Sequence, residues 1–546
     1  MDNIRLILIM ALAFISLLLW EAWQEDYVIP QQRAVQSQSQ VSEVPAAADT
    51  PTVPVQDLAI SPEPAESTLA SASPVRVRTD SLDLLIDRRG GTVIEARLVR
   101  YPVAVDQPDN KIRLMSQDPA DYFIAQSGLL SADKERAPTH EALFASAADE
   151  YRLGENDDSL VVDFLWTSPD GVRVTKRYTF RRGVHSFDLQ HIVDNGSSSA
   201  WTGREYRQIK RGEPVDSGNM FMYTFTGGTA YSPQEKYRKF SFDELAEGKP
   251  NEDVTDGWVA MIQHYFLAAF IPPRGESAHF YGKGSSDGRY LLGSYTPGKV
   301  VESGQQGVFQ GTGFIGPKLT AELRPLAEGL DLTVDYGWLV VLAKPIHWIL
   351  EQINAYVGNW GWTIIIFTVL IKLAFYKLSE TSYRSMANMR KLGPRIQALK
   401  DRYGDDKQRM QQAMMDIYKK EKINPLGGCL PMLVQIPFFI ALYWVLLENV
   451  EMRQAPWILW IQDLSIKDPY FVLPVIMAAS MFVQQKLNPA PPDPMQAKIL
   501  LYLPLVFGIM FAFFPAGLVL YWVVNNILSI AQQWVITRRI EQGAKA

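Results

Sequence analysis

The sequence predicts a multidomain protein that combines an all-α polytopic membrane bundle with a large all-β sandwich and a helical hairpin. Three observations lead to this prediction: long apolar runs, a central region of alternating apolar and polar residues, and a basic stretch between two of the runs. The runs lie at 4–20, 360–375, 430–447, 470–483, 499–514 and 518–534. With their flanks they predict six spans, five of them in a C-terminal core.

These features divide the chain into eight expected segments. They are a signal-anchor span at 1–23, a disordered linker at 24–74, a β-sandwich at 75–336, an interfacial amphipathic helix at 337–354, a second span at 355–377, a helical hairpin at 378–427, spans three to six at 428–537 and a tail at 538–546.

The first apolar run has the form of a signal sequence, with Arg5 at its start. The small-x-small triplet at 11–13 lies inside the apolar core, so we expect an uncleaved anchor with a cytoplasmic N-terminus; cleavage is the alternative. The linker is rich in Gln, Ser, Pro and Ala, and it has too few large apolar residues to offset the entropy of ordering.

Alternation of period two identifies the β region. Ile94, Ala96 and Leu98 alternate with Glu95, Arg97 and Val99. Gly-Gly, Asp-Gly and Asn-Gly pairs lie between such runs and predict turns. His185 and His191 have no metal-ligand spacing, and we interpret them as surface or packing residues. No catalytic constellation is found, so we predict neither an enzyme nor a cofactor or metal site.

Helical spacing marks the next segment. Ile346, Ile349 and Leu350 share one face beside His347 and Glu351, which predicts an amphipathic helix in the outer interface.

Charge sets the expected topology. Residues 377–428 contain twelve Lys and Arg against six Asp and Glu, and two apolar stripes separated by a break at 403–406 predict two antiparallel helices. Because positive loops stay in the cytoplasm, we expect this hairpin and the C-terminus there and the β domain outside the membrane, in the periplasm if the cell is Gram-negative. A net charge of −6 gives no basic excess, so no sequence-specific nucleic-acid binding is expected.

Lys372 lies inside the second apolar run, where an ammonium costs about 3 kcal/mol without water or a polar partner. Asn525, Ser529 and Gln532 share one face of the last run, and Gln435 lies in the third. These residues predict a wet recess open to the cytoplasm. The alternative is that Lys372 snorkels to the interface while the amides bond between helices.

Three classes of function fit a membrane bundle with such a domain. A secondary transporter favours repeats and an acidic coupling residue within the spans, and neither is visible. A membrane-anchored enzyme needs a catalytic constellation. An insertase or chaperone needs only a wet groove that lowers the cost of moving polar segments through lipid, and the sequence favours this class.

Several motifs occur in a characteristic order: Val357-Gly-Asn-Trp-Gly-Trp362, Gly404-Asp-Asp-Lys-Gln-Arg409, Asn424-Pro-Leu-Gly-Gly-Cys429, Arg453-Gln-Ala-Pro456 and Phe514-Pro-Ala-Gly-Leu-Val-Leu-Tyr521. In these motifs the chain closely resembles the YidC family of bacterial inner-membrane protein insertases, in its Gram-negative long form. The resemblance implies insertion and folding of nascent membrane proteins in the lipid bilayer, alone or with the Sec translocon and its accessory subunits, with substrates received from ribosomes. It also implies a periplasmic domain similar to the sugar-mutarotase β-supersandwich.

The resemblance also assigns site residues. Lys372 aligns with a position that is typically Arg, and Tyr521 and Trp522 align with an aromatic pair that contacts substrate. With the polar residues above and Thr368 they form the expected substrate groove. Hairpin residues expected to contact substrate or ribosome are Arg390, Lys391, Arg395, Lys400, Arg402, Lys407 and Arg409.

Overall fold

The computed structural model describes residues 73–214, 224–403, 406–421, 430–488 and 494–543. The expected signal-anchor at 1–23 and the linker as far as residue 72 lie outside these residues, as does the lone cysteine, Cys429.

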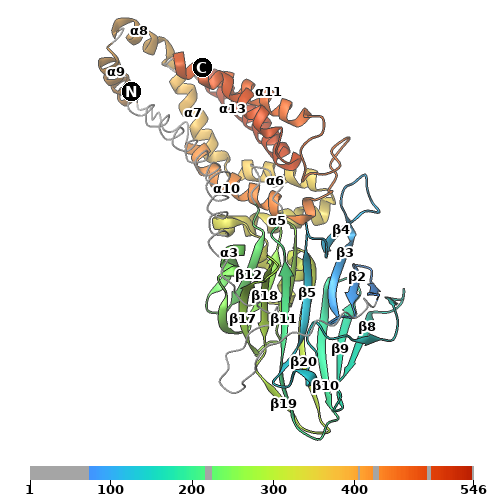
Figure 1. Cartoon of the computed structure of the whole chain (residues 1–546). Helices are drawn as coiled ribbons and strands as arrows, with labels where there is room; N and C mark the ends of the chain where they lie inside the picture. Colours follow the sequence, from blue (N-terminus) through green and yellow to red (C-terminus); the bar gives the residue numbers. More distant parts are fainter. Residues whose placement is uncertain (1–72, 215–223, 404–405, 422–429, 489–493, 544–546) are drawn as a thin grey trace. The chain divides into compact units, whose positions relative to one another are not determined.

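The first half of the described chain is all-β, as the alternation predicts, and consists of two large sheets (Figure 1). The main path of the eleven-stranded sheet is β14 (Asn251–Thr255), β17 (Ser277–Gly284), β18 (Tyr290–Tyr295), β11 (Trp201–Arg211), β5 (Phe123–Ser131), β3 (Thr92–Pro102), β2 (Leu82–Asp87), β1 (Val75–Arg78) and β7 (Glu150–Arg152). Outside this path, β19 (Lys299–Val301) pairs with β11 and β4 (Lys111–Met115) pairs with β3.

The order in the nine-stranded sheet is β13 (Lys236–Phe240), β12 (Gly227–Ser232), β15 (Trp258–Ile262), β16 (Phe266–Ile271), β20 (Gln306–Pro317), β10 (Ser186–Asn195), β9 (Val172–Arg181), β8 (Ser159–Thr167) and β6 (Ala145–Ser146). Along β9 every second side chain is buried, from Val172 to Phe180, which is the pattern of a strand with one face against the core. The buried face of β9 contains one exception to apolar packing, Lys176.

Lys176 belongs to a charged cluster in the β-domain core. His191 Nδ1 lies 2.8 Å from Glu205 Oε1, and Arg207 Nε donates to the same carboxylate oxygen at 3.1 Å. Lys176 Nζ donates to the backbone oxygens of Gly90 at 2.7 Å and Ser127 at 3.2 Å. None of the four charged or titratable side chains is more than 2% exposed. Lys176 and His191 lie on β9 and β10 of the nine-stranded sheet, whereas Glu205 and Arg207 lie on β11 of the eleven-stranded sheet. The cluster therefore joins the two sheets.

Burial lowers the pKa of Lys176 to about 7, an effect that the charge of Glu205 opposes. Burial also lowers the pKa of His191. The carboxylate of Glu205 is therefore the charge that makes the burial of its basic neighbours tolerable. His185 and His191, which the sequence predicts to be surface or packing residues, are both buried. His185 Nδ1 lies 2.9 Å from Glu322 Oε2.

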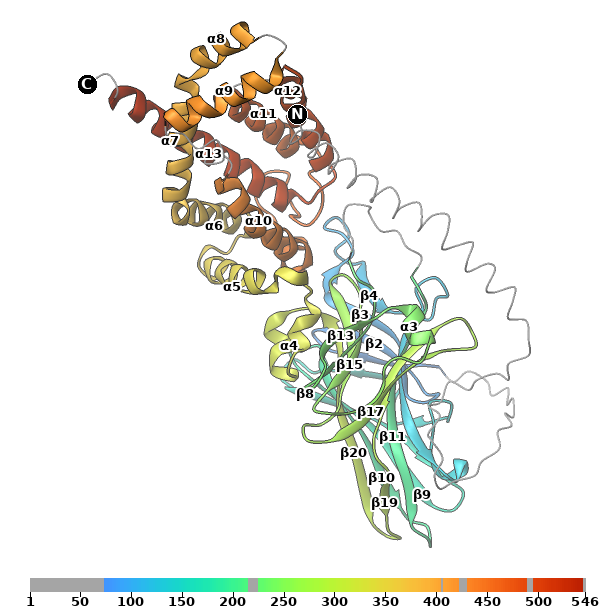
Figure 2. The ribbon, with the colours of Figure 1, turned by 90° about the vertical axis from the view of Figure 1, so that its left-hand side faces the viewer.

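Two short helices belong to the β region, α3 (Phe242–Ala246) and α4 (Thr320–Leu326). The second half of the described chain is helical (Figure 2). Its helices are α5 (Val340–Val357), α6 (Trp360–Ala374), α7 (Tyr376–Lys391), α8 (Gly393–Tyr403), α9 (Lys407–Lys420), α10 (Leu430–Glu448), α11 (Val472–Leu487), α12 (Pro494–Phe511) and α13 (Ala516–Gly543), with a single 3₁₀ turn, η6 (Val450–Met452), after α10.

Local sequence explains where α5 ends and α6 begins. Gly358 ends α5 with φ of 66°, a left-handed conformation that glycine adopts without steric cost. Asn359 then caps α6, since its Oδ1 accepts a hydrogen bond from the Trp362 amide at 3.1 Å. After Ala374 the chain bends by 67° at Phe375 and continues as α7. Lys372 therefore lies in the last turn before a sharp bend.

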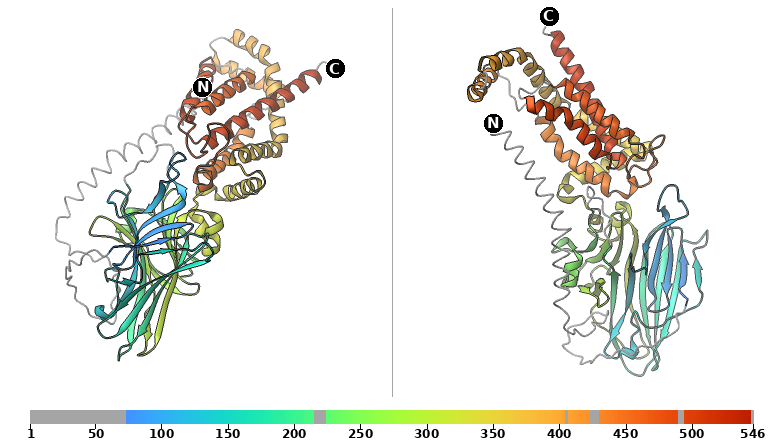
Figure 3. Two further views of the ribbon diagram at one scale, coloured as in Figure 1. Left: turned by 90° about the vertical axis from the view of Figure 1, so that its right-hand side faces the viewer. Right: turned by 45° about the horizontal axis from the view of Figure 1, so that its top comes forward.

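The helix α13 packs against α6, α7 and α11, and it is the long red helix of Figure 3. Six spans are expected from the sequence. Among the described residues, one helix segment, Ala516–Ile540, is long and apolar enough to cross a membrane, or two if α6 and α7 count as one bent span. Val434–Glu448, Val472–Leu487 and Lys498–Phe511 are apolar but shorter.

We predict that Glu205→Gln destabilises the β domain by about 3–5 kcal/mol, because it leaves the buried Arg207 guanidinium without its counter-charge. Hydrogen exchange of the β10 and β11 amides in the full-length protein measures this loss. The control is Asp163→Asn, which breaks the partly exposed Arg177 pair and should cost less than about 1 kcal/mol. Equal protection in the two variants would contradict the role given to Glu205.

Candidate functional site

The site is centred on Lys372, whose side chain is buried among the helices. Lys372 is 8% exposed, and its Nζ donates a hydrogen bond to Ser529 Oγ on α13 at 2.8 Å. Ser529 Oγ in turn donates to the Asn525 backbone oxygen at 2.7 Å. The ammonium therefore points toward α13, and it lacks the exposure expected of a snorkelling lysine.

This contact leaves the ammonium with fewer hydrogen-bond partners than it has donors. An ammonium has three donors, and among the described residues Lys372 uses one of them, toward a neutral hydroxyl. A neutral partner satisfies a hydrogen bond but does not balance a charge. Water or an anionic group can supply the rest.

The aromatic pair predicted on α13 lies against α10. The Tyr521 ring stacks on Phe439 with centroids 6.0 Å apart, and Trp522 meets the same ring edge-on at 4.8 Å. Tyr521 is 7% exposed and Trp522 is half-buried. The indole Nε1 of Trp522 is buried and has no hydrogen-bond partner among the described residues.

The remaining predicted groove residues behave differently from one another. Thr368 is buried and its Oγ1 bonds to the Ile364 backbone oxygen at 2.6 Å, so its polar atom is satisfied within α6. Gln435 and Asn525 are half-buried. Both amide atoms of Gln532 are buried and, within the described part of the chain, have no hydrogen-bond partner.

A second group of polar residues on α13 packs against α11. Asn526 Nδ2 donates to Ser480 Oγ at 3.1 Å, and Gln533 Nε2 donates to the Leu487 backbone oxygen at 3.2 Å. These residues hold the two helices together. The sequence analysis did not predict a role for Ser480. The feature that indicates it is a hydroxyl-bearing residue inside an apolar run.

The polar residues of α13 thus fall into two sets. Asn526 and Gln533 donate hydrogen bonds across to α11, although Gln533 Oε1 has no partner among the described residues. Trp522 and Gln532 keep unpaired polar atoms and make no such bond to α11, and Ser529 accepts a hydrogen bond from the Lys372 ammonium. Unpaired buried polar atoms are costly in an apolar medium, and the usual remedy is water or a polar ligand. The second set has the chemistry needed to receive a polar peptide segment.

The basic residues of the hairpin lie on α7, α8 and α9. Arg395 pairs with Glu421 at 2.6 Å and Arg409 with Asp406 at 3.3 Å, and both arginines are exposed. The Arg402 guanidinium lies 5.8 Å from the centre of the Tyr403 ring. The side chains of Arg390, Lys391, Lys400 and Lys407 lie outside the described residues.

Comparison with known proteins gives matches along nearly the whole chain. Two family models match: the YidC periplasmic domain at residues 74–349 and the 60Kd inner membrane protein at residues 352–543. The membrane protein insertase YidC of Thioalkalivibrio sulfidiphilus is 51% identical over 559 residues, with all of both chains covered. The protein of the same name in Methylococcus capsulatus is 49% identical over 546 residues, covering 100% of this chain and 99% of the relative.

A solved structure of an active YidC insertase covers 85% of this chain and is itself covered to 94%, at 18% identity and a TM-score of 0.39. A galactose mutarotase related enzyme from Lactobacillus acidophilus covers 44% of this chain and is itself covered to 97%, at 9% identity and a TM-score of 0.30. Both TM-scores are too low to establish a shared fold, so family membership rests on the sequence matches. The chain belongs to the YidC family of bacterial inner-membrane proteins with a periplasmic domain.

Proposed function

We propose that this protein is a membrane protein insertase that receives polar segments of nascent membrane proteins in a hydrophilic groove centred on Lys372. The observation that carries the proposal is the buried Lys372–Ser529 hydrogen bond, because it leaves a positive charge among apolar helices without a counter-ion among the described residues. The names of the relatives, which are membrane protein insertases, support the same class of function.

The proposed mechanism follows from solvation and charge. A polar, often acidic segment of the substrate enters the groove and exchanges water for a charge-assisted hydrogen bond with the Lys372 ammonium. The apolar segment of the substrate partitions into lipid along α10 and α13, beside Phe439 and Trp522. Outward release is driven by that partition and by the membrane potential, about 2.3 kcal/mol per charge per 100 mV. No cofactor is required by these steps.

The finer topology belongs to the same proposal. We infer six spans, with both termini and the hairpin at 378–427 in the cytoplasm, and a groove open to that side. The basic residues of the hairpin then meet nascent chains or ribosomes, and larger substrates are handled together with the Sec translocon. The exposure of Arg395 and Arg409 supports this role for the hairpin.

The site residue Lys372 gives a prediction about insertion. Lys372→Ala should slow insertion of substrates with acidic outer segments by about tenfold or more, because a charge-assisted hydrogen bond is lost, whereas Lys372→Arg should retain activity. Insertion into proteoliposomes containing the purified variants measures the rate. Lys377→Ala is the matched control, since Lys377 is an exposed cation just beyond the bend. Normal insertion of acidic substrates by Lys372→Ala would remove the proposed role.

Hydration of the groove can be tested with thiol chemistry, because the chain contains a single cysteine. In a Cys429→Ser background, the thiol of a Lys372→Cys variant should react with a polar maleimide added from the cytoplasmic side. Leu370→Cys is the control: Leu370 is 47% exposed in the protein and should face lipid, so its thiol should stay unreactive. Equal protection of both thiols would show that the surroundings of Lys372 are dry.

Substrate contact gives a third prediction. A photoreactive amino acid in place of Trp522 should crosslink to stalled nascent membrane proteins, because its side chain lies beside the groove. The same probe in place of Trp534, which lies on α13 but is 54% exposed, should crosslink much less. Solute-coupled currents without crosslinks at Trp522 would instead support a transporter.

A further inference from the structure

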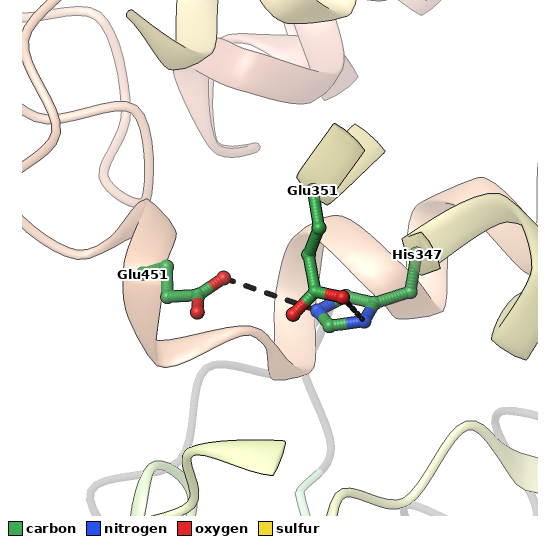
Figure 4. Close-up of side chains that lie close together, drawn as sticks. All are labelled: His347, Glu351 and Glu451. Atoms are coloured by element: carbon green, nitrogen blue, oxygen red, sulfur yellow. Dashed lines mark ion pairs between the residues drawn. The ribbon is translucent and has the colours of Figure 1, made fainter. Parts of the chain in front are cut away.

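A cluster of metal-ligating side chains lies away from Lys372, where α5 meets η6. His347 and Glu351 lie one turn apart on α5, and Glu451 comes from η6 (Figure 4). His347 Nδ1 lies 3.6 Å from Glu351 Oε2, and His347 Nε2 lies 3.9 Å from Glu451 Oε2. One donor atom from each of the three side chains lies within 4.8 Å of the others.

These separations are too long for direct hydrogen bonds, which need about 2.7–3.2 Å. The two carboxylates face different nitrogens of the His347 ring, so an ion shared by the three residues would bind one of those nitrogens; one donor atom from each residue lies within 4.8 Å of the others. Oxygen and imidazole nitrogen ligands lie about 2.0–2.2 Å from Zn²⁺, so neighbouring ligand atoms in one coordination shell are separated by roughly 3–3.5 Å. Small side-chain movements would bring the three donors to this spacing.

The charge balance of the cluster also calls for a cation. Among the described residues, the ion-pair partner of both Glu351 and Glu451 is His347. Arg324 and Lys344 pair with Asp331, although the charge of Arg324 also acts on Glu351. Two crowded carboxylates without a basic partner form a site of negative potential.

Tyr336 provides a second, independent observation. It is 4% exposed, its hydroxyl has no hydrogen-bond partner in the described part of the chain, and its ring centre lies 5.9 Å from that of His347. Glu451 Oε2 is likewise buried without a hydrogen-bond partner among the described residues. An ion with a bound water would satisfy both orphaned groups.

We propose that His347, Glu351 and Glu451 form a binding site for one divalent transition metal ion, with the Tyr336 hydroxyl bonded to a water on that ion. A nitrogen ligand beside two carboxylates favours Zn²⁺ or a similar ion over Mg²⁺ and Ca²⁺, which prefer all-oxygen sites. The ion would join α5 to the turn after α10 and so fix the interfacial helix. This site is independent of the groove and of the proposed insertase activity.

The test uses the full-length protein in detergent, stripped with a chelator and dialysed against Zn²⁺. Metal analysis should find one Zn²⁺ per chain, and His347→Ala and Glu451→Gln should each reduce this to less than a tenth. His279→Asn is the matched control, because His279 also faces a carboxylate, Asp253, but lies on β17 of the β domain. That variant should keep the full stoichiometry.

A second measurement separates loss of the site from loss of the fold. Zn²⁺ should raise the Tm of the stripped wild-type protein and not that of Glu351→Gln, a nearly isosteric change that keeps the gel-filtration profile of the wild type. Mg²⁺ at the same concentration should have no effect on either protein. Absence of bound Zn²⁺ in the wild type, or equal binding by wild type and all three site variants, would overturn the proposal.

Discussion

The helical half of the molecule depends on how one ammonium group is accommodated among apolar helices. Lys372 lies in the last turn of α6, and the chain bends by 67° directly after it. Its hydrogen bond to Ser529 ties this turn to α13, 157 residues away in sequence. Because the acceptor is a neutral hydroxyl, the contact positions the charge without neutralising it. An apolar environment makes such a charge available to any anionic or hydrated group that can reach it.

The polar residues of α13 need partners, and the fold supplies them unevenly. Toward α11, Asn526 and Gln533 donate hydrogen bonds that stabilise helix packing, although Gln533 Oε1 has no partner in the described chain. Neither amide atom of Gln532 is paired in the described chain, and the indole of Trp522, which lies against Phe439 of α10, also lacks a partner there. Buried polar atoms left unpaired are costly in an apolar medium, and water or a polar ligand can satisfy them.

The sequence predicted the features that depend on local pattern. Alternation identified the all-β region, and a lysine within an apolar run identified the central residue of the candidate site. The sequence did not predict the bend at Phe375, because neither proline nor glycine lies at that position. Nor did it pair Ser480 with Asn526 or bring Glu451 to His347, since those contacts depend on how distant helices and turns pack. Residue identity predicts which groups need partners, whereas the tertiary fold decides which partner each one receives.

Two of the buried lysines among the described residues, Lys176 and Lys372, differ in how far the fold itself compensates their charge. Lys176 is fully enclosed by the β sheets, donates to two backbone oxygens and lies in the field of Glu205, so its position is satisfied by the fold itself. Lys372 is nearly as buried but has one neutral partner among the described residues. Folding alone gives no reason to keep a cation so incompletely compensated, since an apolar residue would pack there at lower cost. Under the proposed function, a polar segment of a substrate that arrives from outside the chain supplies the compensation that Lys372 lacks.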